Sequence, residues 1–323
     1  MDIAEKERHN AWGVKSLPSP LLPMIFLFAA LLLSCRTAPP MIPGVEDQAV
    51  FIPLEPGGFA YVFIDVEKAR PIIDTLSFRG MDTSDRQFQR ILDSTQSAMA
   101  AIYVSQDAGT RFRLVAQGSY PSRRARTAMR CSRHWRGRRS GFSGERYWYS
   151  PTAMLSVSMN RREAFVSTSL CEIPIDPFYS GTGTLVPDGF NEFRSGAIIS
   201  CWLEDPATFI NQLLREMNLN IMLPAEQLFV RLSQADESDG GPRYVGHIQI
   251  RVANPLLARN LSIALFVART LLIAAATGGE NAAAVMASIL LANPATATGN
   301  NLHIRTNPMS IDEISLLVGQ FSP

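Results

Sequence analysis

The stretch from Leu32 to Cys35 most constrains what this chain can fold into, because it sets where the folded part begins. It closes an apolar run, Leu21 to Leu33, that follows three basic residues among the first fifteen. A basic region, a hydrophobic region, a small residue and a cysteine in this order are typical of a lipoprotein signal. Leu32 and Ser34 match what signal peptidase II requires before the cysteine. We therefore predict a signal peptide over residues 1–34.

Cys35 is the predicted lipidation site of the mature chain. Its thiol would carry a diacylglycerol and its freed amine a third chain such as palmitate. At about 0.8 kcal/mol per buried CH₂, three acyl chains make a stable anchor. The alternative is an uncleaved transmembrane anchor, but the apolar run is closer in length to a signal core than to the ~20 residues of a membrane span. The sequence favours a protein held on a membrane by lipid.

The composition predicts a folded body behind this anchor. Hydrophobic residues make up 46% of the chain, which is ordinary for a globular protein. Cys131, Cys171 and Cys201 follow Cys35, so at most one internal disulfide can form, and the sequence leaves the pairing open. Hydrophobic packing must therefore hold the fold together.

Residues 35–57 are rich in proline and predict an extended tether. Residues 58–172 then predict a first α+β half. Its expected elements are a strand over 59–66, helices over 67–76 and around 88–95, a hairpin over 102–116, a basic helix over 122–131 and a second hairpin over 154–167.

The remaining chain repeats this plan after a linker over 173–194, which is rich in proline and glycine. Residues 195–323 predict a strand over 196–203, a helix opened by Pro206, a hairpin over 229–252 and a helix opened by Pro255. We therefore predict an α+β fold of two related halves, each of strand, helix, hairpin, helix, strand order. Extra apolar amphipathic helices distinguish the C-terminal half.

These extra helices occupy residues 255–292, where the only formal charges are Arg259, Arg269 and Glu280. Two glycines divide the segment into a helix over 255–277 and an alanine-rich helix over 280–291. The first is long enough to span hydrocarbon, but a mid-helix arginine costs at least about 2.5 kcal/mol there. Lying in the membrane interface avoids that cost.

Two interpretations of the segment stay open: a membrane-facing helix pair, or a buried core pair. Both interpretations are correct if the helices close over a cavity when the protein is in water and open when it meets lipid. The candidate residues for binding acyl chains are Leu256, Leu257, Leu261, Leu265, Phe266, Leu272 and Ile273.

A run of nine arginines between residues 123 and 146 contains a single acid, Glu145. On an exported lipoprotein such a run would meet lipid phosphates rather than nucleic acid, and its Trp and Tyr residues suit headgroup depth. The alternative is a solvated loop whose arginines balance acids elsewhere. The candidate residues for anionic headgroups are Arg123, Arg124, Arg136, Arg138 and Arg139.

Enzyme and metal motifs are absent from the sequence. Residues 141–144 are one residue short of a nucleophile elbow, and residues 181–183 lack the third glycine of a dinucleotide loop. His134, His247 and His303 each stand alone, without another ligand at metal-binding spacing. We therefore expect no enzymatic activity, no cofactor and no metal.

The lipobox with Arg36 after the cysteine, the two related halves and the apolar helices resemble the concealed outer-membrane lipoproteins of pathogenic treponemes. The resemblance implies a lipid-anchored protein on the periplasmic face of a spirochaete outer membrane. It also implies amphipathic helices that enter the inner leaflet and a lipid-sized cavity. The implied role is to carry lipid or glycolipid, or to alter membrane permeability.

We thus expect a protein whose partners are membrane lipids, through their acyl chains and anionic headgroups. The alternative is an envelope scaffold or assembly subunit that binds a protein partner through the same helices. A weaker third hypothesis is a hydrolase with an unrecognised site. It would need a cleft in which one of the histidines faces a carboxylate and a hydroxyl.

Overall fold

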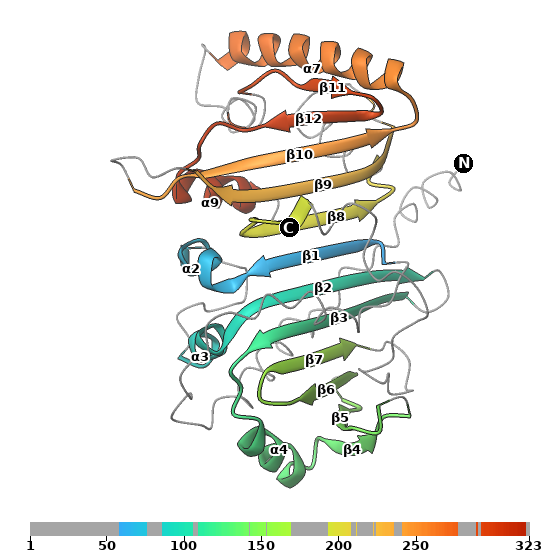
Figure 1. Ribbon diagram of the computed structural model, residues 1–323, viewed down its shortest axis with the longest axis vertical. Helices are drawn as coiled ribbons and strands as arrows, with labels where there is room; N and C mark the ends of the chain where they lie inside the picture. Colours follow the sequence, from blue (N-terminus) through green and yellow to red (C-terminus); the bar gives the residue numbers. More distant parts are fainter. Residues whose placement is uncertain are drawn as a thin grey trace, which may run out of the picture.

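Runs rich in β-branched and aromatic residues form strands over much of the described chain, and twelve strands make one antiparallel sheet (Figure 1). The computed structural model describes residues 58–75, 86–105, 109–168 except 142 and 153, 193–207, 211, 222, 224–235, 241–276, 289 and 292–320. The predicted signal peptide, Cys35 and the tether lie outside these residues. So does the helix expected over 280–291, apart from Ile289.

The strands are joined by short turns within the hairpins and by long connections elsewhere, such as those after β1, β7 and β10. Their bounds are β1 (Ala60–Asp65), β2 (Thr95–Ser105), β3 (Gly109–Gly118), β4 (Arg136–Arg139), β5 (Arg146–Ser150), β6 (Leu155–Met159), β7 (Glu163–Thr168), β8 (Ile199–Glu204), β9 (Ala225–Gln234), β10 (Tyr244–Val252), β11 (Thr296–Thr298) and β12 (Asn301–Arg305). In space their order is β11-β12-β10-β9-β8-β1-β2-β3-β7-β6-β5-β4.

The middle of the sheet is the antiparallel pair β1 and β8, in which Tyr61 lies opposite Trp202. Strands from residues 95–168 continue the sheet on one side, and strands from residues 225–305 continue it on the other. The predicted fold class is therefore wrong. The described chain is mainly one continuous antiparallel sheet, with no helix-rich pair of α+β halves. Apolar spacing gives the conformation of a segment but cannot say which strand edges pair, and β1 pairs with β8 across a gap of more than 130 residues.

Five helices are named in the described part of the chain: α2 (Val66–Thr75), α3 (Arg86–Ser94), α4 (Ser122–Cys131), α7 (Pro255–Ala276) and α9 (Ile311–Gln320). The helix expected over 122–131 has the predicted bounds, and α7 ends one residue before the predicted end. The sequence interpretation missed β4, β5, β11, β12 and α9.

The two faces of the sheet are packed differently. Helices α2, α7 and α9 cover one face over a core cluster that includes Ile250 and Leu302, and α4 covers a second cluster near Val157 on the same face. The opposite face holds a third cluster, in which the Tyr61 and Trp202 rings lie 5.5 Å apart. Apolar residues on both faces explain why the central strands lack the clean alternation of a one-sided sheet.

Candidate functional site

Helix α7 lies along the β11 end of the sheet, and one of its faces belongs to the core (Figure 1). Ala258, Leu261, Leu265 and Ala268 are buried, at the spacing of one helical stripe. The helix is also fastened by a hydrogen bond in which Ser262 Oγ donates to the carbonyl oxygen of Ala295 at 2.5 Å. The inner face of α7 therefore packs like any core helix.

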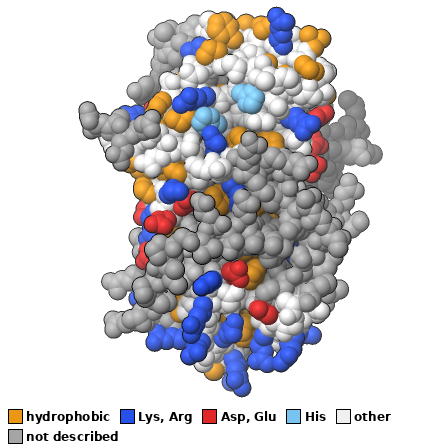
Figure 2. Space-filling model, in the orientation of Figure 1, with side chains coloured by type: hydrophobic (Ala, Val, Ile, Leu, Met, Phe, Trp, Pro, Cys, Tyr) orange, Lys and Arg blue, Asp and Glu red, His pale blue; other side chains and the backbone are white. Residues whose placement is uncertain are grey.

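The outer face of α7 also carries large apolar residues. Leu256 is 68% exposed, Ile263 57%, Phe266 51% and Val267 50%. Their spacing of seven, three and one residues keeps them on one side of the helix. Single exposed apolar residues are normal, but an apolar stripe along an exposed helix marks a contact surface. Figure 2 shows hydrophobic side chains gathered at the end of the molecule where α7 lies.

The structure divides the predicted lipid-binding residues between these two faces. Leu261 and Leu265 lie in the core, Leu257 is half-buried, and Leu256 and Phe266 are exposed. Leu272 and Ile273 belong to α7, but their side chains lie outside the described residues. Ile263 and Val267 were missed, although helical spacing from Leu256 would have found both. In the part of the chain that the structure describes, no helix is both long and apolar enough to cross a membrane.

The predicted headgroup arginines lie at the other end of the sheet, on α4 and the edge strand β4. Arg123, Arg124, Arg136, Arg138 and Arg139 are all exposed. Figure 2 shows basic side chains crowded at this end of the molecule. The neighbouring Arg126 has another role, because its guanidinium donates to the carbonyl oxygen of Met159 at 2.7 Å.

The aromatic residues of this region do not share its exposure. Trp135, Tyr147, Trp148 and Tyr149 are all buried, and both tryptophans belong to the core cluster under α4. The expectation that they reach headgroup depth is therefore wrong for this conformation. Aromatic residues in the core of a sheet and aromatic residues at a membrane interface can have the same spacing, so the sequence alone did not distinguish them.

The apolar and basic surfaces are far apart. Between β11, beside α7, and β4 lie ten further strands, which at about 4.8 Å per strand separate the two ends by roughly 50 Å. The outer face of α7 and the arginines of β4 are therefore not parts of one continuous contact site.

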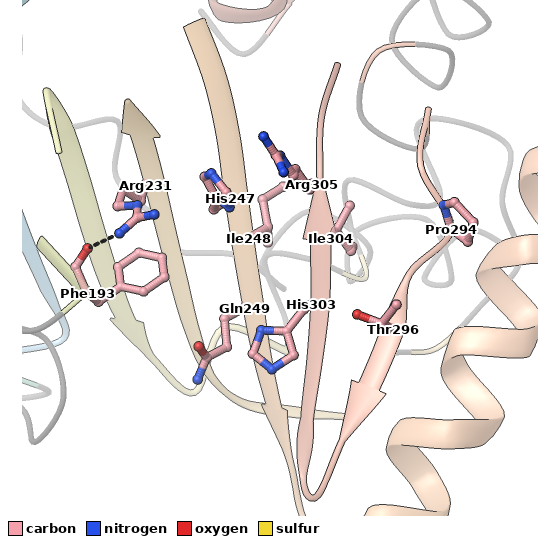
Figure 3. Close-up of a pocket in the computed structure, with 10 residues that line it drawn as sticks. All are labelled: Phe193, Arg231, His247, Ile248, Gln249, Pro294, Thr296, His303, Ile304 and Arg305. Atoms are coloured by element: carbon pink, nitrogen blue, oxygen red, sulfur yellow. Dashed lines mark hydrogen bonds between the residues drawn. The ribbon is translucent and has the colours of Figure 1, made fainter. Parts of the chain in front are cut away.

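The three histidines have different surroundings. His134 is exposed beside α4, whereas His247 and His303 line one pocket of about 440 Å³ on β10 and β12 (Figure 3). Sequence reasoning treated these two as solitary because only the pairing of β10 with β12 brings them together. None of the ten described lining residues is acidic, so these ten supply no carboxylate of the kind that the hydrolase hypothesis needs. No cluster of three metal-ligating side chains occurs within the described ranges.

The two described cysteines, Cys131 and Cys201, are both free thiols. Cys131 is exposed at the end of α4. Burial in β8 raises the pKa of Cys201 to about 12, so that thiol stays protonated and unreactive at neutral pH. Cys171 lies outside the described residues.

No known protein family matches the sequence, and no curated protein does. Solved structures of TP0453, a Treponema pallidum protein, do match in fold. Crystal form III superposes with a TM-score of 0.54 at 14% identity, covering 85% of this chain and 100% of that one. Crystal form IV gives 0.53 at 15% identity, covering 83% of this chain and 95% of that one. At this level of identity the likeness shows the fold.

Proposed function

We propose that this protein, which shares its fold with TP0453, is a lipid-anchored envelope protein that contacts a membrane through the outer face of α7. The observation that carries the proposal is the exposed apolar stripe of Leu256, Ile263, Phe266 and Val267. The lipobox ending at Cys35 and the resemblance to treponemal outer-membrane lipoproteins support it. They also favour the periplasmic face of an outer membrane as its place.

The stripe by itself would bind a bilayer weakly. Each of its four side chains still exposes half or more of its surface, and moving that remainder into acyl chains contributes roughly 1 kcal/mol per residue. A total of about 4 kcal/mol corresponds to a dissociation constant near 1 mM. Lipidation at Cys35 would hold the stripe beside a bilayer at high effective concentration, so the two features reinforce one another.

Arginine placement fits a helix lying in the interface. Arg259 is exposed on the same side of α7 as Leu256 and Ile263. Its long side chain can reach a lipid phosphate while the apolar residues sink below it. Helix α7 has no acidic residue over its 22 positions, so nothing on it repels an anionic surface.

Carriage of lipid or glycolipid is the finer part of the proposal. In the described conformation Leu261 and Leu265 pack into the core beneath α7. An acyl chain could enter there only if α7 moved away from β10 and β12, exposing these leucines. Such opening matches the expectation of helices that close in water and open onto lipid.

The test uses residues 36–323 and vesicles that contain phosphatidylglycerol. Ile263→Glu with Phe266→Glu places two carboxylates in the stripe, and we expect at least a tenfold loss of vesicle binding in a flotation assay. The matched control is Ala297→Glu with Thr298→Glu, which adds the same two charges to exposed positions of β11 beside the helix. Equal binding by parent, test and control proteins would contradict the proposal.

The scaffold alternative makes a different prediction for the same variants. Cross-linking in intact envelopes should then recover a stoichiometric protein partner with the parent chain and lose it with the Ile263→Glu, Phe266→Glu variant, while no form binds vesicles. The anchor is tested separately: palmitate label should enter the parent chain and be absent from Cys35→Ala.

A further inference from the structure

The pocket that contains His247 and His303 lies on the sheet face opposite the core cluster under α7. Its volume of about 440 Å³ is within the range of small-molecule sites. The lining residues come from β9, β10, β12, the segment before β8 and the segment that includes β11: Phe193, Arg231, His247, Ile248, Gln249, Pro294, Thr296, His303, Ile304 and Arg305. The pocket is independent of the outer face of α7.

Strand register arranges the polar side chains of the pocket in two rows. Arg231, His247 and Arg305 lie opposite one another on β9, β10 and β12. Gln249, His303 and Thr296 form the next row, on β10, β12 and β11. Figure 3 shows the first three level with one another and the second three one step along the strands. Neighbours within a row are on strands only about 4.8 Å apart.

The first row concentrates positive charge, and the described residues around it hold no acid. No lining residue is acidic, and none of the ion pairs found among the described residues involves Arg231 or Arg305. Burial lowers the pKa of His247, and the charges of Arg231 and Arg305 lower that pKa further. The imidazole therefore senses two cations, and no carboxylate of the described residues pairs with either of them.

Arg231 is held in place but is not satisfied. One of its terminal nitrogens donates to the carbonyl oxygen of Phe193 at 3.5 Å, and its guanidinium lies 5.6 Å from the centre of the Phe193 ring. That ring in turn packs on Phe229 at 5.4 Å. Its Nε is buried, and no hydrogen-bond partner for it exists among the described residues. A buried donor on a charged group is costly to leave unpaired, so Arg231 is stabilised if its side chain turns to meet an acceptor.

We propose that this pocket binds a phosphate group, either free phosphate or the headgroup of a phospholipid or phosphorylated glycolipid. A planar carboxylate is satisfied by one arginine fork, whereas a tetrahedral oxyanion uses donors that converge from several directions. Arg231 and Arg305 approach from opposite sides of His247, and Gln249 and His303 add further donors. Phosphate oxygens would neutralise the row, and a turn of the Arg231 side chain would let its Nε donate to one of them.

Inorganic phosphate titrated into the full chain tests the proposal. The side-chain NMR resonances of His247 and His303 should shift saturably, while those of the distant His134 stay in place. Arg231→Gln and Arg305→Gln should each weaken binding about tenfold or more, because each removes a charged hydrogen-bond donor. Arg251→Gln is the matched control, since Arg251 is on the same face of β10 and donates to Gln227 at 3.4 Å, outside the pocket.

The source of the phosphate is read from a parallel titration with dihexanoyl phosphatidylglycerol below its micelle concentration. Tighter binding of this lipid than of inorganic phosphate assigns the pocket to a headgroup, and tighter binding of the inorganic ion assigns it to free phosphate. The proposal is overturned if neither ligand saturates, or if Arg251→Gln weakens binding as much as Arg231→Gln. The parent titration decides the matter even if a variant fails to fold.

The result of the phosphate titration can also be distinguished from the result of the vesicle-binding test. Ile263→Glu with Phe266→Glu should retain phosphate binding, because α7 contributes no residue to the pocket. Loss of phosphate binding in this folded variant would contradict the independence of the two sites.

Discussion

His247 shows how a residue that looks ordinary in the sequence acquires a distinct environment in the fold. It is partly buried on β10, between Arg231 on one side and Arg305 on the other. Burial is the larger cause of its lowered pKa, and the two arginines add to it. The folded state therefore favours the neutral imidazole.

This environment predicts a pH dependence of stability. Because the folded-state pKa of His247 is below its ordinary value, the unfolded chain takes up a proton first as the pH falls. The contribution to the free energy of unfolding is present above about pH 6.5 and is lost as the pH falls through the lower folded pKa. His247→Gln should reduce the decrease in urea midpoint between pH 7.5 and pH 5. If the decrease in urea midpoint is the same in both proteins, other groups cause it. Added phosphate should make this decrease smaller in the parent but not in His247→Gln.

At the scale of the element, α7 combines a packed face with a free apolar face. A sequence of this kind has little amphipathic contrast, since leucine, isoleucine and phenylalanine occur all round the helix. A helix that is apolar all round is ordinarily buried on every side. Here the sheet end leaves one side uncovered, so the helix is half core and half surface.

Alanine substitutions should separate the two faces of α7. Leu265→Ala removes a buried side chain and should lower the free energy of unfolding by about 2–5 kcal/mol, as large-to-small core substitutions do. Ile263→Ala, on the exposed face, should change it by no more than about 0.5 kcal/mol. Urea unfolding measures both. Similar losses in the two variants would show that the outer face is covered in solution.

At the scale of the whole molecule, an open twelve-stranded sheet must protect two edges. One edge is the three-residue strand β11, beside which α7 packs. The other is β4, a four-residue strand that carries Arg136, Arg138 and Arg139, all exposed. Short edge strands and charged edge residues both prevent edge-to-edge pairing of sheets. The arginines of β4 therefore have a structural role besides the headgroup contact that the sequence predicts for them.

One triple variant and one double variant distinguish the structural role of the arginines from headgroup contact. Arg136→Thr, Arg138→Thr and Arg139→Thr together should increase aggregation, because they leave a neutral edge strand of high β propensity. Arg123→Thr with Arg124→Thr removes charge from α4, away from the edge, and should leave aggregation unchanged. Light scattering at several protein concentrations measures the difference. If both variants bind anionic vesicles less well and neither aggregates, headgroup contact alone explains the arginines.

The sequence by itself determined local structure and, through the lipobox, the predicted anchor. Helix α4 has its predicted bounds, and α7 differs by one residue, because helical spacing and proline at a helix start are local signals. The hairpins β2–β3 and β9–β10 occur where hairpins were predicted. However, β2 begins at Thr95, seven residues before the predicted strand, and Thr95 was assigned to the preceding helix. The anchor at Cys35 and the domain boundaries stay predictions.

Only the tertiary structure decided the rest. The pairing of β1 with β8 made a single sheet where two halves were expected, and the pairing of β10 with β9 and β12 brought Arg231, His247 and Arg305 into one row. The position of α7 at the sheet end decided which of its apolar residues became core and which stayed exposed. Strand pairing and burial depend on contacts between segments far apart in the chain, and periodicity within one segment carries no information about them.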